Sequence, residues 1–435
     1  MKKDNSSRLR HISRRDFLAG AAATAAGLLA GCRQTAQPIP TSTSEPVVGP
    51  ISTNTPLPPT YTPTSSPTLT PTSTATQMPV ELPTATATNL PTATSTPAPT
   101  AAPVNTPTTI PTPAAAYQVA IAQATSYDRS LIRQQVETMF DGLGGLEDVI
   151  KPGDRVAIKV NLTGGASWKL PGGAPLTEVY FTHPEVVRAL GELLRDAGAG
   201  QIFIVEAFWD QASYTSLGYA EVAQALNATL VNLNEVQPYS DFAATPVGPD
   251  PIIYQNFVFN HILEEIDVFV SVAKMKCHYN CGVTHAMKNL IGLVPLQHYQ
   301  SAPTDSFRSA MHGPDAETGG RLPGVILDLN RARPIHLAVI DGVKTAEGGE
   351  GPWQQTFAPV EPGVLIAGKN AVSTDAVATA VMGFDPTAAS YTKPFTRCDN
   401  YLNMAYERGL GSNRLNDIEV VGASINEVRY EFQPA

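Results

Sequence analysis

The sequence predicts an α/β fold in which a largely parallel sheet is covered by helices on both faces. Short runs rich in β-branched residues recur through residues 117–435, and a segment between two of them has the periodicity of an amphipathic helix. Strands that alternate with helices are typical of parallel sheets, because parallel neighbours need a crossover. This length of chain allows one large domain or two intertwined lobes.

Seven segments have the length and composition of buried strands. They are residues 119–123, 155–160, 201–206, 268–272, 337–341, 364–367 and 418–421. Ligands of such sheets collect at the carboxyl ends of the strands. Polar residues stand at four of these ends, namely Asn161, Glu206, Lys274 with Lys276, and Asp341. We therefore expect these side chains to share one rim of the sheet.

Residues 184–197 have the pattern of a helix. Apolar residues recur at helical spacing, at Val186, Val187, Leu190, Leu193 and Leu194. Thr182 is the expected N-cap, and Gly198 is expected to end the helix.

Residues 1–32 have the features of an export signal. The run Ser13-Arg14-Arg15-Asp16-Phe17-Leu18 is similar to a twin-arginine signal, and the apolar stretch behind it is too short to span a bilayer. Leu29-Ala30-Gly31-Cys32 resembles the lipobox of bacterial lipoproteins. These likenesses imply recognition by the twin-arginine export machinery and a lipid anchor on Cys32. The protein would then be held at the outer face of the cytoplasmic membrane or at the cell surface; the alternative is an ordinary exported protein.

Residues 33–116 consist mostly of Thr, Pro, Ser and Ala. Such a segment cannot bury enough apolar surface to offset its chain entropy, so it is expected to be a disordered tether. At about 3.1 Å per residue when fully extended, it would reach roughly 250 Å. The folded domain is then expected over residues 117–435.

The formal charge of the chain is -10, which makes nucleic acid an unfavourable partner. Against this acidic background, residues 274–289 contain three lysines, two histidines and two cysteines between two apolar runs. Buried ammonium groups need an anion or a lowered pKa. We therefore expect a small anionic ligand, bound by Lys274, Lys276, Asn161 and Asn289. The alternative is that Lys274 and Lys276 face water at a strand end.

Several motifs together resemble the domain of unknown function 362 family. They are Lys151-Pro-Gly-Asp-Arg-Val-Ala-Ile-Lys-Val-Asn161, Thr182-His-Pro-Glu-Val-Val-Arg188, Lys274-Met-Lys-Cys-His278, Met287-Lys-Asn-Leu-Ile-Gly292, Val339-Ile-Asp-Gly-Val343, Ser373-Thr-Asp-Ala-Val377 and Met382-Gly-Phe-Asp-Pro386. The resemblance covers nearly all of residues 117–430. It implies no settled reaction. Many members carry an iron–sulfur segment, but this chain has only Cys277, Cys281 and Cys398 beyond Cys32, so it has no intrinsic four-cysteine motif.

An enzyme that acts on a small anion is the first functional hypothesis. His278 is the candidate acid or base, Lys288 neutralises the anion, and His312 is a further candidate catalytic group. The cofactor is open, and a divalent metal is one candidate. Asp341, Glu347 and Asp375 are possible oxygen ligands for Mg²⁺.

A second set of metal ligands is Cys277, Cys281 and His285, whose spacing of four would place them on one helical face, suited to zinc. The same cysteines could instead form a local disulfide or remain buried thiols. His278, Gly282 and Lys288 are also similar to the segment of the lactate racemase family that carries a nickel-pincer cofactor on a lysine. That likeness covers about twenty residues and adds racemase-like or redox chemistry as an alternative. A non-catalytic receptor for an anion or metal, and a structural protein with solvated lysines, are the remaining alternatives.

Overall fold

The computed structural model describes residues 117–313 and 320–435. The expected export signal, the Cys32 anchor and the tether of residues 33–116 lie outside the described residues. Within the described residues, no helix has the length and apolar character needed to cross a bilayer.

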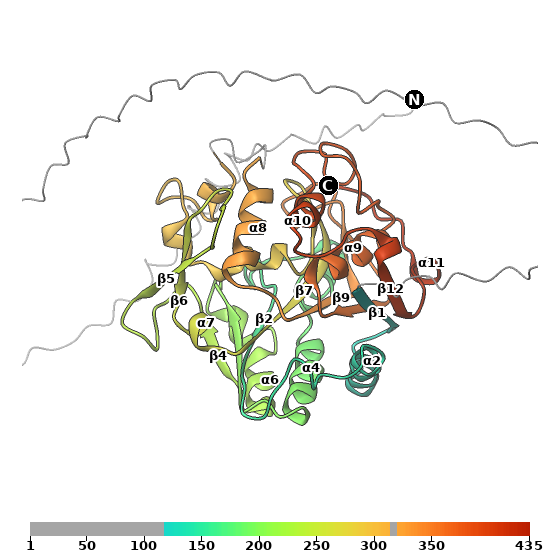
Figure 1. The fold of residues 1–435 in the computed structure, drawn as a ribbon, viewed down its shortest axis with the longest axis horizontal. Coiled ribbons are helices and arrows are strands. Elements are labelled where there is room, and N and C mark those ends of the chain that lie inside the picture. The colour runs from blue at the N-terminus through green and yellow to red at the C-terminus, as the bar shows by residue number, and fades with distance from the viewer. Residues whose placement is uncertain (1–116, 314–319) are drawn as a thin grey trace, which may run out of the picture. The chain divides into compact units, whose positions relative to one another are not determined.

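The central sheet has the strand order β12-β1-β11-β9-β7-β2-β3-β4 (Figure 1). Its strands are β1 Tyr117–Gln123, β2 Arg155–Lys159, β3 Gln201–Glu206, β4 Thr229–Asn232, β7 Val268–His278, β9 Leu337–Glu347, β11 Val364–Gly368 and β12 Ile418–Gly422. β11 is antiparallel to both of its neighbours, and the other pairs in this order are parallel. The predicted α/β class with a largely parallel sheet is confirmed. All seven expected strands are present, and β4 is an additional one.

Short antiparallel strands extend the sheet beside its centre. β8 (Gly282–Thr284) pairs with β7, and β10 (Ala358–Val360) pairs with β9. A separate hairpin is formed by β5 (Phe242–Pro246) and β6 (Asn256–Asn260).

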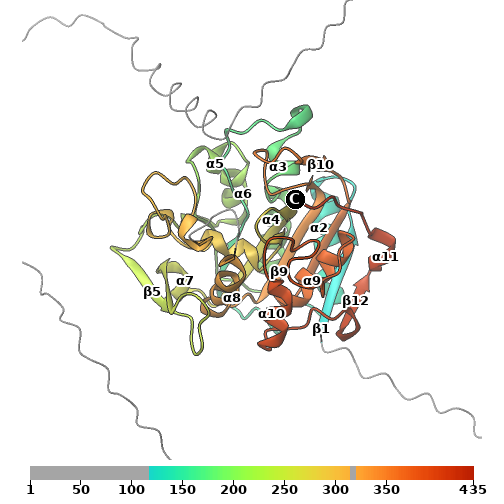
Figure 2. The same ribbon diagram turned by 90° about the horizontal axis from the view of Figure 1, so that it is seen from above.

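Helices cover both faces of the sheet, and each face has its own apolar core. One face packs against α2 (Arg129–Gly142), α4 (Pro184–Asp196) and α6 (Tyr219–Leu226), and the other against α8 (Leu322–Ala332), α9 (Ala371–Val381) and α10 (Tyr401–Glu407). Figure 1 shows these two layers on opposite sides of the sheet, and Figure 2 shows α8, α9 and α10 beside one another. The shorter helices are α3 Leu176–Val179, α5 Ala212–Thr215, α7 Ile262–Glu265 and α11 Ile425–Val428. Single 3₁₀ turns are η2 Pro171–Gly173, η3 Lys288–Leu293, η4 Leu296–His298, η5 Ser309–Met311 and η6 Leu415–Asp417.

Helix α4 forms where its periodicity predicts, but its N-cap differs from the prediction. His183, rather than Thr182, caps the helix, because its Nδ1 accepts from the Glu185 N–H at 3.2 Å. The Thr182 hydroxyl instead accepts from the Asn161 N–H (3.0 Å) and donates to the Val272 carbonyl (2.8 Å). Thr182 therefore ties the end of β2 to the middle of β7.

Strand β7 continues six residues beyond the expected end at Val272, and every residue of Val268–His278 is buried. Side chains alternate along a strand, so Lys274, Lys276 and His278 share one side of β7. Met275 and Cys277 take the other side and join the apolar core there. The alternative that Lys274 and Lys276 face water is wrong, because they are 0% and 1% exposed.

Candidate functional site

The candidate site lies where β2, β3 and β7 reach their carboxyl ends. These strands are neighbours in the sheet, so the residues that close them lie side by side. Lys159 ends β2, Glu206 ends β3, and the long β7 carries Lys276 and His278 past them.

A network of amides joins the ends of β2 and β7. The Asn289 Oδ1 accepts from Lys159 Nζ and from Asn161 Nδ2, each at 3.2 Å. The Asn289 Nδ2 donates to the Ser271 hydroxyl at 3.1 Å. Asn161 and Asn289, both predicted to bind a ligand, therefore lie together. The Asn161 Oδ1 is buried and has no hydrogen-bond partner within the described chain.

Lys159 was not among the predicted site residues, because it lies inside a run that has the composition of a core strand. The structure places its ammonium 3.0 Å from Glu206 Oε1, with both side chains buried. Glu206 also accepts from the Leu162 and Ala207 N–H groups, each at 3.0 Å. Gly292 lies against this pair, since a Cβ at that position would come within 2.3 Å of Glu206 Oε1. The sequence could have revealed Lys159, because a lysine in a strand that is otherwise apolar enough for full burial must be buried with it.

Lys274 and Asp341 form a second buried ion pair. Lys274 Nζ lies 2.9 Å from Asp341 Oδ2, and both side chains are 0% exposed. The Tyr127 hydroxyl donates to Asp341 Oδ1 at 2.8 Å, and the His183 N–H donates to Oδ2 at 2.9 Å. The Lys274 charge is thus neutralised within the protein by Asp341. Its expected role in binding a ligand stays a prediction.

Lys276 differs from its neighbours on β7 because it has no carboxylate partner among the described residues. Its ammonium donates to the carbonyl oxygens of Tyr180 (3.1 Å) and Glu350 (3.3 Å), and it lies 4.3 Å from the centroid of the Tyr180 ring. Burial, followed by the nearby charge of Lys288, lowers the pKa of Lys276 to about 7. Near neutral pH, the Lys276 side chain can therefore be either an ammonium, which can lose a proton, or an amine, which can gain one.

Lys288 opens η3 and is the most exposed of the lysines at the site, being half-buried. Its positive charge lowers the pKa values of Lys276, His278 and His312, although burial is the larger cause in each case. Lys288 is therefore within electrostatic range of all three. We call Lys276, His278, Lys288 and His312 the basic cluster.

Both histidines of the basic cluster are neutral at pH 7. Burial lowers the pKa of His278 well below its usual value and that of His312 to about 4. His278 Nδ1 accepts from the Asn280 N–H at 3.1 Å, which places its proton on Nε2. His312 Nδ1 lies 3.1 Å from the Arg308 carbonyl oxygen, an acceptor, so its Nε2 holds the free lone pair. The cluster thus has one imidazole that can donate and one that can accept.

Glu350 carries a negative charge that raises the pKa values of Lys276, His278 and His312. It was not predicted as a site residue. Burial opposes its ionisation, but its pKa still falls to about 2 because His278, the Tyr279 N–H and the Trp353 indole favour the carboxylate. Glu350 accepts from Tyr279 N at 2.9 Å and from Trp353 Nε1 at 2.8 Å. In the sequence, only the glycine-rich segment around Glu350 could have indicated that this residue lies at the site.

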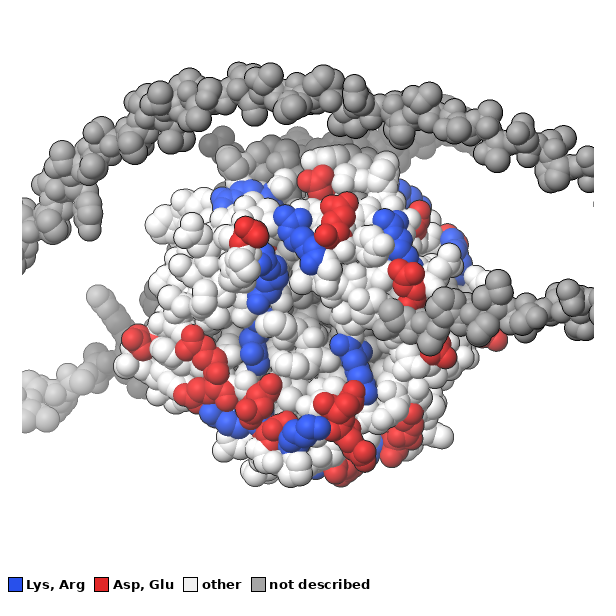
Figure 3. All heavy atoms as spheres, viewed as in Figure 1, with Lys and Arg blue, Asp and Glu red and all other residues white. Residues whose placement is uncertain are grey.

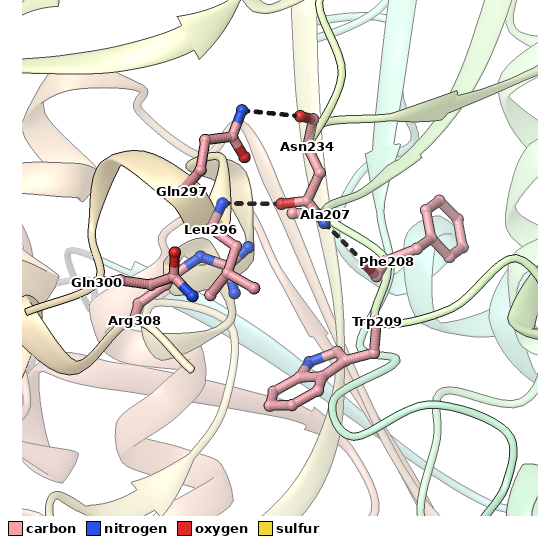
Figure 4. Close-up of a pocket in the computed structure, with 8 residues that line it drawn as sticks. All are labelled: Ala207, Phe208, Trp209, Asn234, Leu296, Gln297, Gln300 and Arg308. Atoms are coloured by element: carbon pink, nitrogen blue, oxygen red, sulfur yellow. Dashed lines mark hydrogen bonds between the residues drawn. The ribbon is translucent and has the colours of Figure 1, made fainter. Parts of the chain in front are cut away.

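A cavity of about 250 Å³ begins at Ala207, the residue after Glu206 (Figure 4). It is lined by Ala207, Phe208, Trp209, Asn234, Leu296, Gln297, Gln300 and Arg308. Trp209 is 38% exposed, and Trp353, next to Glu350, is 39% exposed. Trp168 lies 5.6 Å from Trp353 between ring centroids. The three tryptophans of the chain therefore all lie around the site, which the sequence did not indicate.

Residues 156–380 match the family described as Domain of unknown function (DUF362). The chain belongs to the DUF362 family. A relative, the Thylakoid-associated protein sll1697 of Synechocystis, is 27% identical over 271 residues, which are 62% of this chain and 75% of that protein.

Two solved structures are similar to the chain. A protein from Thermotoga maritima has 15% sequence identity and a TM-score of 0.32, over 57% of each chain. The lactate racemase apoprotein from Thermoanaerobacterium thermosaccharolyticum has 11% identity and a TM-score of 0.33, over 58% of this chain and 56% of that one. The DUF362 chain thus spans less than two thirds of either structure.

The two metal-ligand sets predicted for the DUF362 chain are not assembled. Asp341 is paired with Lys274, Glu347 accepts from the Gln433 N–H at 2.8 Å, and Asp375 accepts from the N–H groups of Ala286 (2.9 Å) and Met287 (3.0 Å). In residues 117–313 and 320–435, no group of three or more His, Cys, Asp or Glu side chains is placed to hold a metal ion.

Cys277, Cys281 and His285 do not share a helical face, because residues 277–285 form the β7–β8 hairpin rather than a helix. Both cysteines and Cys398 are free and buried. Burial raises the pKa values of Cys277 and Cys281 to about 12, so neither is a thiolate at neutral pH. His285 contacts Met382, with 3.1 Å between Nε2 and Sδ. The buried-thiol alternative is the one that the structure shows.

Loss of one member of the buried Lys274–Asp341 pair should destabilise the protein strongly. Asp341→Asn is expected to lower the free energy of unfolding by about 3–5 kcal/mol, because it leaves an uncompensated ammonium in the core. The surface pair between the half-buried Lys369 and the exposed Asp148 is the control, and Asp148→Asn should cost less than about 1 kcal/mol. Urea denaturation at neutral pH measures both. Similar small losses in the two variants would contradict the assigned ion pair, and Lys274→Met/Asp341→Leu should recover most of the loss.

Proposed function

We propose that this DUF362 protein is an enzyme that binds a small anion at the basic cluster and transfers a proton to or from it. The observation that carries the proposal is Lys276, a lysine that is 1% exposed and has no ion pair among the described residues. Burial of an unpaired cation is costly, and an anionic ligand would offset that cost.

The balance of charge around the cluster supports an anionic ligand. Within the described residues, three cationic side chains, Lys159, Lys276 and Lys288, are near two carboxylates, Glu206 and Glu350. One of these carboxylates is already paired with Lys159. On the face shown in Figure 3, basic and acidic side chains are interspersed. The lysines of the site are instead brought together by the ends of buried strands.

The pKa values support acid–base chemistry rather than binding alone. Because Lys276 has a pKa of about 7, both its ammonium and its amine are present at neutral pH. In the fraction of molecules in which Lys276 is an amine and Lys288 holds the carboxylate of the ligand, the amine takes a proton from the carbon next to that carboxylate, and the electron pair stays on the ligand as an enolate. Lys288 stabilises the added negative charge, and the His278 Nε2–H donates a hydrogen bond to it. Return of the proton from the Lys276 ammonium restores the amine.

We also propose that the protein is exported and held at a membrane surface through Cys32. The support is the twin-arginine-like and lipobox-like sequence of residues 13–32. The name of the thylakoid-associated relative is compatible with a membrane-surface location. Two or more acyl chains give stable attachment without a spanning helix.

Cys32→Ser should move the protein from the membrane fraction to the soluble fraction, because it removes the site of acylation. Cell fractionation followed by immunoblotting measures the distribution, and metabolic labelling with palmitate measures acylation. The matched control is Cys398→Ser, since Cys398 is a buried thiol of the folded domain. A Cys32→Ser protein that remained labelled and in the membrane fraction would refute the anchor.

Anion affinity should depend on pH through Lys276. The ammonium form binds the anion, so affinity should be highest below the pKa of about 7 and should fall as the pH rises above it. The limiting slope is about tenfold per pH unit. Sulfate is the probe for calorimetry between pH 6 and pH 9, because its own charge does not change in that range. Lys276→Met should flatten the profile, and Lys369→Met, at a surface lysine paired with Asp148, should preserve it. An unchanged profile in Lys276→Met would refute the role of Lys276.

Proton transfer can be tested separately from binding. The protein is incubated in D₂O with 2-hydroxy, 2-oxo and 2-amino carboxylates, and proton NMR follows loss of the C–H signal next to the carboxylate. At least one compound should exchange with the wild type, and Lys276→Met and His278→Asn should slow its exchange by about a hundredfold. Lys369→Met is again the control. Sulfate binding without exchange of any compound would instead support a non-catalytic receptor.

A further inference from the structure

We propose that the cavity beside the basic cluster is a carboxylate subsite anchored by Arg308, so that the ligand is a small molecule with two acidic groups. One group lies at the basic cluster and the other at Arg308. This inference rests on the proposed function for the first group, whereas the second group is argued from the cavity alone.

The cavity is formed by segments that follow two neighbouring strands. Ala207, Phe208 and Trp209 follow β3, and Asn234 follows β4; the facing wall is η4 with Gln300 and Arg308. Figure 4 shows Arg308 and Gln300 extending from one side of the cavity and Trp209 standing on the other. Its position at the carboxyl ends of parallel strands is where α/β proteins bind ligands.

Arg308 has the unsatisfied donors that a carboxylate would accept from. The residue is 7% exposed, and its Nε donates to the Val294 carbonyl at 2.8 Å. Its Nη2 is buried and has no hydrogen-bond partner within the described chain. A buried guanidinium with free donors is costly, and a carboxylate can accept two parallel hydrogen bonds from it. The fork of the guanidinium therefore favours a planar carboxylate over a single-point acceptor.

The walls of the cavity are held in place by Asn234. Its Oδ1 accepts from the Leu296 N–H at 2.8 Å, and its Nδ2 donates to the Phe208 carbonyl at 2.7 Å. Gln297 Nε2 donates to the Asn234 carbonyl at 3.3 Å. These bonds link the two sides of the cavity, as Figure 4 shows. The subsite is thus formed before any ligand binds, which reduces the ordering cost of binding.

Arg308 is connected to the basic cluster through its own backbone. Its carbonyl oxygen is the partner of His312 Nδ1 at 3.1 Å. The charges of Arg308 and Lys288 both lower the pKa of Lys159, after the larger effect of burial. Lys159 therefore lies within electrostatic range of both anion-binding groups. A cavity of about 250 Å³ is at the small end of ligand sites, so a short carbon chain joins the two acids.

Calorimetry with acetate, succinate, glutarate and adipate at pH 6.5 tests the subsite, and Trp209 fluorescence gives a second readout. The wild type should bind at least one dicarboxylate about tenfold to a hundredfold more tightly than acetate, as expected for an added two-point ion pair. Arg308→Gln should abolish this preference and leave acetate affinity within about threefold of the wild-type value. The exposed Arg408→Gln is the matched control and should keep the preference.

Arg308→Lys covers the case in which Arg308→Gln does not fold. It keeps the charge but cannot make two parallel bonds, so it should also lose most of the dicarboxylate preference. An unchanged preference in a folded Arg308 variant, or a wild type without any preference at concentrations up to about 10 mM, would overturn the subsite. Failure of the proposed function would give a different result. Lys276→Met and Lys288→Gln would then bind acetate as the wild type does, while Arg308→Gln would still lose the preference for dicarboxylates over acetate.

Discussion

Burial of the central strand β7 is the constraint on which the rest of the structure depends. β7 lies between β9 and β2 in the sheet, and all eleven of its residues are buried. One side of it carries Lys274, Lys276 and His278, so two ammonium groups and an imidazole are removed from water. Each must be paired, neutralised or left as a binding group. Asp341 pairs with Lys274, and His278 is held neutral by burial. Lys276 has only carbonyl oxygens and the Tyr180 ring around its ammonium, which is why we propose it as the binding group.

The difference between the two lysines of β7 follows from its neighbour β9. Lys274 is aligned with Asp341 on β9, whereas Lys276 is aligned with Ala346 after a shift in register between them. Regular pairing would have aligned Lys276 with Val343, so its neighbour on β9 carries no charge in either register. The Lys276 ammonium is instead held by carbonyl oxygens and the Tyr180 ring. The same strand pair therefore produces a buried ion pair at one position and, two residues later, a buried lysine without a carboxylate partner among the described residues.

Much of the fold could be predicted from the sequence, but less of the site. Runs of β-branched residues located all seven predicted strands, because burial on both faces demands apolar side chains. The end of β7 was missed because lysines are not expected inside a buried strand. The predicted sets of metal ligands do not assemble, because their carboxylates have other partners. Asp375 accepts hydrogen bonds from backbone N–H groups, and Asp341 pairs with Lys274, which spacing along the chain does not show. Glu350 and Arg308 become functional candidates only through the approach of segments far apart in sequence.

Asp375 shapes the site through hydrogen bonds to the backbone. From α9 it accepts the N–H groups of Ala286 and Met287, the two residues before Lys288. At the other end of the same segment, Gly292 has no side chain and can lie against the ion pair that closes β2. The segment is thus fixed at both ends, and Lys288 is held among like charges by backbone hydrogen bonds and packing. The fold itself maintains this repulsion, so the anion site that we propose would need no ordering of the chain before it binds.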